Sequence, residues 1–115
     1  IRDRAQGELR QMESDVRMVE LRLEQELLEN VQNWESSYSE AERLKTELLP
    51  LAEKAFKLAR SGYEKGRFAY LEVLDAQRTL FDARSQYHDA LKRYHTARAN
   101  VERLTTEIGD KNEIN

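Results

Sequence analysis

The chain has 115 residues, of which 36% are charged and 39% hydrophobic, with 4 glycines and 1 proline. This composition is typical of long helices and coiled coils, and it excludes a globule with a thick apolar core. The formal net charge of −3 provides no basic stripe for nucleic acid, and the lack of cysteine excludes disulfide and thiolate chemistry.

Apolar residues recur at steps of three and four along the first half of the chain, which predicts a helix over about 3–61. The two steps of four from Leu23 through Leu27 to Val31 indicate a stutter, which locally unwinds a supercoil. Pro50 predicts either a helix end or a kink, and we favour a continuous or slightly kinked helix because the apolar spacing carries across it. The expected inward positions are Ala5, Leu9, Met12, Val16, Val19, Leu23, Leu27, Val31, Trp34, Tyr38, Ala41, Leu44, Leu48, Leu51 or Ala52, Ala55 and Leu58.

The segment Ser61-Gly62-Tyr63-Glu64-Lys65-Gly66 is the turn signal of the chain, since it places two glycines beside a serine. One of these glycines is expected to adopt the left-handed conformation that ends the first helix. We therefore place the tip of a helical hairpin at 61–68.

A second helix is predicted over about 68–106, antiparallel to the first, in a two-helix coiled-coil hairpin. Gly109 is expected to end the ordered chain and to leave 109–115 as a disordered or frayed tail. The first helix is the longer one, so its opening residues need apolar partners from elsewhere. The inward positions of the second helix are Val73, Ala76, Leu80, Ala83, Tyr87, Ala90, Tyr94, Ala97, Val101 and Leu104.

The sequence offers no set of side chains for catalysis, so we expect no enzyme and no cofactor. His88 and His95 are seven residues apart, about 10.5 Å along a helix axis, which is too far for a shared metal ion. The sequence contains no run of about 18 apolar residues, the length that a helix needs to cross a bilayer. Because the chain opens at Ile1 without an initiating methionine, we expect it to be a fragment of a longer protein.

The stretch from Ala59 to Arg78 carries a Gly-Tyr-x-x-Gly turn followed by an acidic-Val-Leu-Asp-Ala run. Leu49-Pro50-Leu51-Ala52-Glu53 precedes it, and Ala90-Leu91-x-x-Tyr94-x-x-Ala97 follows it. Together these features resemble the outer membrane efflux protein (TolC) family over about residues 5–106. The Tyr-Leu-Glu-Val-Leu-Asp-Ala-Gln-Arg segment is most similar to CzcC- and CusC-like members of heavy-metal pumps.

The resemblance implies a fragment of an α-helical barrel, the periplasmic tunnel of a trimeric outer-membrane channel. Residues 1–108 would be a periplasmic hairpin of the second repeat. The channel would work in a tripartite pump of the RND type, with a periplasmic adaptor protein and, through it, an inner-membrane pump. The periplasmic portion of an outer-membrane protein is the implied location.

The resemblance also assigns roles at the tip. Glu72 and Asp75 would face the lumen near the channel entrance, where three copies form a ring of carboxylates that favours cations. Both acids also suit an ordinary solvated first helical turn. The residues implied in adaptor docking are Gly62, Tyr63, Lys65, Gly66, Arg67 and Phe68.

Two other functions fit the helical pattern alone. A free-standing structural coiled coil would show the same heptads but has no need for the tip motif. The helical hairpin of an adaptor protein also docks through its tip but carries a different tip pattern.

Overall fold

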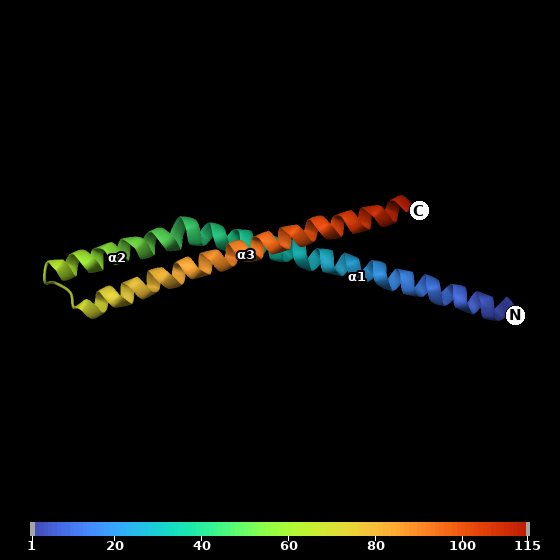
Figure 1. The fold of residues 1–115 in the computed structure, drawn as a ribbon, viewed down its shortest axis with the longest axis horizontal. Helices are drawn as coiled ribbons and strands as arrows, with labels where there is room; N and C mark the ends of the chain where they lie inside the picture. Colours follow the sequence, from blue (N-terminus) through green and yellow to red (C-terminus); the bar gives the residue numbers. More distant parts are fainter. Residues whose placement is uncertain (1, 115) are drawn as a thin grey trace. The chain divides into compact units, whose positions relative to one another are not determined.

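The computed structural model describes the backbone of residues 2–114 and the side chains of residues 3–110. The chain forms α1 (Arg2–Arg43), a π-helical turn η1 (Leu44–Leu48), α2 (Leu49–Glu64) and α3 (Tyr70–Ile114), and the described residues contain no strand. Near the tip, α2 and α3 run side by side and are joined by residues 65–69 (Figure 1). The predicted all-α helical hairpin is confirmed.

The described residues fall into two compact units. One unit is Trp34–His95, which holds the tip and the surrounding parts of both arms. The other consists of the described residues before Trp34 and after His95.

Pro50 explains the π-helical turn that links α1 to α2. A proline cannot donate to the carbonyl four residues before it, and its ring collides with that carbonyl in a regular α-helix. In η1 the helix widens, and the Leu49 N–H donates to the Leu44 carbonyl, five residues back. Pro50 then lies in the first turn of α2, where a missing N–H costs little. The helix therefore continues through Pro50, as expected.

The wider turn shifts the inward face of α2 by one residue. Beyond Leu44, which is 2% exposed, the covered positions are half-buried Leu49, buried Ala52 and half-buried Phe56 and Ala59. The predicted positions Leu48, Ala55 and Leu58 are exposed instead, so that part of the predicted seam is wrong, whereas of the alternatives Leu51 and Ala52 it is Ala52 that is buried. An uninterrupted heptad count cannot anticipate the residue that a π-turn adds.

The α3 half of the seam is as predicted. Val73, Leu80 and Ala90 are buried in the tip-bearing unit, and the intervening Ala76, Ala83, Tyr87 and Tyr94 are half-buried. Small and large residues alternate along this face, which lets the two helices approach closely.

The centre of the tip-bearing unit is a small apolar cluster of Ala41, Leu44 and Ala90, with Tyr87 and Leu91 packed against it. The side chain of Arg93 on α3 forms an ion pair with Glu40 on α1 in the same unit.

A group of aromatic rings extends this packing. The rings of Trp34 and Tyr38 lie 6.4 Å and 5.9 Å from the ring of Tyr94. Ser37 occupies the inward position that we predicted for Tyr38, and its fully buried hydroxyl donates to the Trp34 carbonyl at 3.1 Å.

In the other unit, a polar pair lies beside the predicted stutter position. The side-chain amide of Asn100 donates to Asn30 Oδ1 at 3.2 Å, and both residues are half-buried. Val31, which the stutter places inward, is half-buried as well, so Asn30 and Val31 are both partly covered at this turn. The apolar count missed Asn30 because its side chain is polar.

The start of α1 exposes its apolar face, as we expected from the unequal helix lengths. Leu9, Met12 and Val16 are 57%, 65% and 54% exposed, and Val19 is 44% exposed. Burying a leucine or valine contributes about 1.5–3 kcal/mol, so this face favours a partner.

The helix boundaries differ modestly from the predicted ones. The first arm ends at Glu64 rather than 61, and α3 begins at Tyr70 rather than 68. Backbone helix continues past Gly109 to Ile114, beyond the predicted end near 106. A glycine in a helix costs about 1 kcal/mol, which is too little to end a helix whose neighbouring residues favour it. The side chains beyond residue 110 lie outside the described set.

Candidate functional site

The tip is closed by a Schellman turn centred on Gly66. The Arg67 N–H donates to the Gly62 carbonyl at 2.7 Å and the Gly66 N–H to the Tyr63 carbonyl at 3.0 Å, which satisfies two carbonyls that the helix end leaves free. Gly66 has φ +74°, and it is the only described residue with a positive φ. The expected left-handed glycine is therefore the second of the pair.

Gly62 has a different role, because the ring of Phe68 lies on it. Gly62 is buried, and an added Cβ would meet the ring of Phe68, with its Cγ 3.0 Å away and two other ring carbons closer still. The Phe68 N–H also donates to the Gly62 carbonyl at 3.3 Å. The chain beyond the turn is thus held to Gly62 through both backbone and side chain.

A second aromatic contact spans the base of the turn. The rings of Tyr63 at the end of α2 and Tyr70 at the start of α3 lie 5.2 Å apart with a 55° tilt. Tilted ring pairs at this separation are favourable. Both rings are about half exposed, so they also form part of the tip surface.

Of the predicted docking residues, all but Gly62 are exposed. Lys65, Gly66 and Arg67 lie in the loop itself, and Tyr63 and Phe68 flank it. No atom lies within 4 Å of where a Cβ of Gly66 would be, so the loop surface is open there. The loop presents two cationic side chains on a turn fixed by backbone hydrogen bonds.

Glu72 and Asp75 lie just beyond the tip on the first turns of α3, and both are exposed. Their spacing of three places them on the same side of the helix. The Glu72 N–H donates to the Ala69 carbonyl at 3.0 Å, and the Asp75 carbonyl accepts a hydrogen bond from the Thr79 hydroxyl. Neither carboxylate forms an ion pair with another described residue, so both are available to meet solvent or a cation.

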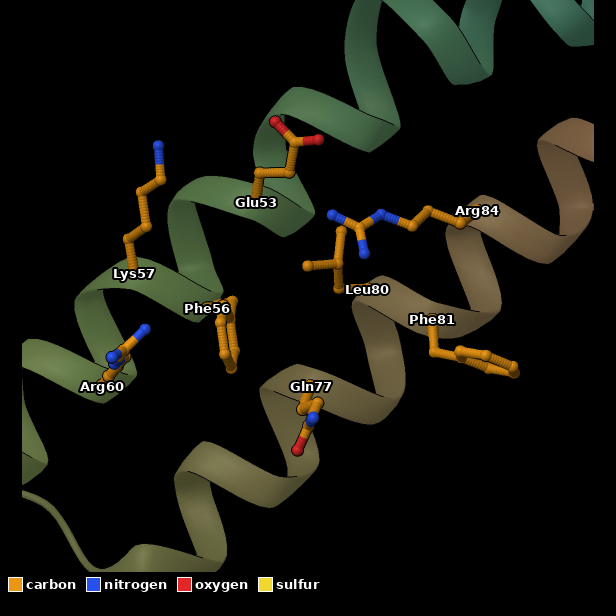
Figure 2. A pocket seen from close by; sticks show the side chains of 8 residues that line it. All are labelled: Glu53, Phe56, Lys57, Arg60, Gln77, Leu80, Phe81 and Arg84. Carbon is orange, nitrogen blue, oxygen red and sulfur yellow. The ribbon is translucent and has the colours of Figure 1, made fainter.

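A groove between α2 and α3, which we did not predict, lies above the tip (Figure 2). Its volume is about 510 Å³. Phe81 is 71% exposed and points away from α2, whereas Arg84 reaches from α3 toward α2. Phe81 follows the inward Leu80, so a seam count assigns it to the solvent side. The groove is lined by Glu53, Phe56, Lys57, Arg60, Gln77, Leu80, Phe81 and Arg84.

The two histidines take part in aromatic contacts. The rings of His88 and His95 lie 6.0 Å and 5.3 Å from those of the preceding tyrosines, Tyr87 and Tyr94. Within the described residues no three His, Asp, Glu or Cys side chains gather closely enough to hold a metal ion. None of the described helices carries an apolar stretch long enough to cross a membrane.

Comparison with known proteins gives one match. A family model described as outer membrane efflux protein matches residues 2–107, which is most of the chain and includes the tip. No curated protein and no solved structure matches the chain.

Proposed function

Because the chain belongs to the outer membrane efflux protein family, whose members are channel proteins, we propose that it forms part of the periplasmic tunnel of a trimeric channel. The channel works in a tripartite pump of the RND type that exports heavy-metal ions. The heavy-metal assignment rests on the similarity of the segment from Tyr70 to Arg78 to the CzcC- and CusC-like members.

Exposed apolar faces support the assembly of several copies. Leu48 at the end of η1 and Leu51 and Leu58 on α2 are 44%, 65% and 59% exposed, and their spacing puts them on one side of the helix. On α3, Leu71 and Phe81 are 66% and 71% exposed. A monomer rarely leaves such stripes in water, whereas a wall of packed helices would cover them.

The tip is the proposed docking site for the periplasmic adaptor. The observation that carries this proposal is the open loop Lys65–Arg67, held on a Schellman turn and flanked by the half-exposed aromatic rings of Tyr63 and Phe68. Aromatic residues and arginine are enriched at interaction surfaces, and a rigid support holds them in place. Gly62 contributes from beneath the surface rather than by direct contact.

Glu72 and Asp75 are the proposed entrance ring. Three copies would bring six carboxylates together, which attracts cations and makes the closed entrance electrostatically strained. The exposure of both side chains in the hairpin is consistent with this role.

Charge reversal at the loop tests the docking proposal. Lys65→Glu with Arg67→Glu in the full-length protein should abolish metal resistance and co-purification of the adaptor, without changing the amount of channel in the outer membrane. Lys92→Glu, at another exposed lysine on α3, is the matched control and should retain both. Resistance and co-purification that survive the double reversal would refute docking through this loop.

A further inference from the structure

The direction of the loop charges depends on the backbone of the tip. Lys65 and Arg67 take part in none of the ion pairs or side-chain hydrogen bonds of the described residues. No side chain packs over Gly66 between them, because the space where its Cβ would be is open. Whatever fixes the loop backbone therefore also fixes where these two side chains leave the tip.

Gly62 is the residue to which this backbone is tied. Its carbonyl accepts hydrogen bonds from both Arg67 at 2.7 Å and Phe68 at 3.3 Å. Its Cα is covered by the ring of Phe68, so closely that a methyl group could not fit between them. One glycine thus receives the returning chain on its carbonyl and an aromatic ring on its Cα.

The Phe68 ring is the only one of these attachments that a side chain controls. The hydrogen bonds belong to the backbone and follow the turn, whereas the ring contact requires an aromatic group at 68 and a glycine at 62. Phe68 is 44% exposed, so its ring could leave Gly62 for solvent without unfolding the helices.

We propose that Phe68 is a positioning residue, whose ring, resting on Gly62, holds the Lys65–Arg67 loop in the orientation that the docking partner meets. This proposal rests on the proposed docking function of the tip, but the contact itself can be measured without any partner. Phe68 and Gly62 act as one clasp, in which each residue needs the other.

The first experiment measures the clasp in the 115-residue chain by trypsin cleavage after Lys65 and Arg67. Phe68→Ala and Gly62→Ala should each raise the cleavage rate roughly fivefold or more, since loops are cut from their opened state. The double variant should be cut no faster than Phe68→Ala alone, because the clasp can be lost only once. Gly7→Ala, at a helical glycine where an added Cβ would meet no other part of the chain, is the control and should leave loop cleavage unchanged.

Proton NMR provides a second readout that general loosening would not reproduce. A ring over Gly62 should shift its Hα resonances upfield, and Phe68→Ala should remove that shift while Phe68→Tyr keeps it. Three results would each overturn the clasp. They are a trypsin cleavage rate in Gly62→Ala equal to that of the wild type, a rate in the double variant equal to the product of the two single effects, and Gly62 Hα resonances that are not shifted in the wild type.

The second experiment asks whether the clasp serves docking. In the full-length channel, Phe68→Ala should reduce co-purification of the adaptor, and Phe68→Tyr should restore it. If the Phe68→Ala channel co-purified as much adaptor as the wild type, although trypsin cuts its loop faster, the positioning role would be overturned. Failure of the docking function itself would appear separately, as a Lys65→Glu/Arg67→Glu variant that still co-purifies with the adaptor and still confers metal resistance.

Discussion

Gly66 is the residue at which the backbone of the tip demands glycine most plainly. Its φ of +74° lies in the left-handed region, which costs other residues about 1–2 kcal/mol. The space around it is open, so strain rather than crowding decides the outcome of a substitution.

Gly66→Ala should therefore lower the free energy of unfolding by about 1 kcal/mol, and Gly66→Asn by less, because asparagine tolerates this conformation. Urea unfolding followed by circular dichroism measures both. Gly109→Ala, in the interior of α3, should instead raise stability by about 0.5–1 kcal/mol. Equal effects of alanine at 66 and 109 would contradict the assigned turn.

Glu72 and Asp75 give a prediction on conduction. Glu72→Gln with Asp75→Asn should reduce the cation selectivity of the full-length channel in planar bilayers, because the proposed ring would lose up to six negative charges. Glu102→Gln, at an exposed acid far along α3, serves as the control. If the double variant had the same cation selectivity as the wild type, the proposed entrance ring would be refuted.

The sequence motif identified the tip but could not show which of its two glycines has the left-handed conformation and which one is buried. The left-handed turn was predictable because a helix ending between paired glycines needs one of them at φ above zero. The burial of Gly62 was not, because it depends on a ring that arrives from beyond the turn. Phe68 follows in sequence as one more exposed loop residue, and only the folded turn brings it back onto α2.

At the scale of the element, η1 is the feature that changes how α2 packs. By adding one residue to a turn, it carries Ala52 and Phe56 inward and turns Leu48, Leu51 and Leu58 outward. The same helix thus has one face for α3 and another apolar face that remains free.

Two alanine substitutions distinguish this arrangement from an unbroken heptad. Leu44→Ala should cost about 2–5 kcal/mol, because Leu44 is 2% exposed in the apolar cluster. Leu51→Ala should stay within about 0.5 kcal/mol of wild type in the dilute chain, because Leu51 is 65% exposed. Unfolding at low protein concentration measures both, and similar losses would mean that both leucines are inward.

The α3 face could be predicted except at half-buried Asn100, because the rest of the predicted face consists of apolar residues with no proline between them. The first arm could be predicted only in part. Asn30 and Ser37 are covered polar residues, which an apolar count passes over, and Pro50 changes the helical repeat. The hydrogen bonds that cover these polar groups, between Asn100 and Asn30 and from Ser37 to Trp34, become visible only in the folded chain.

At the scale of the whole molecule, the fold and the family agree. A helical hairpin with free apolar stripes suits a protein whose helices pack into a larger wall, and the family match covers residues 2–107. The fold class followed from heptad spacing alone, whereas membership of the family depended on the tip motif. Spacing alone could not supply the family, because scaffolds and adaptor hairpins share it.

The most direct test of the channel proposal is the location and mass of the full-length protein. Cells carrying it are fractionated, and the assembly extracted from the membrane in detergent is weighed by native mass spectrometry. Our account predicts an outer-membrane protein with the mass of three copies. A full-length protein found in the soluble fraction, or extracted as a single copy, would contradict the trimeric channel.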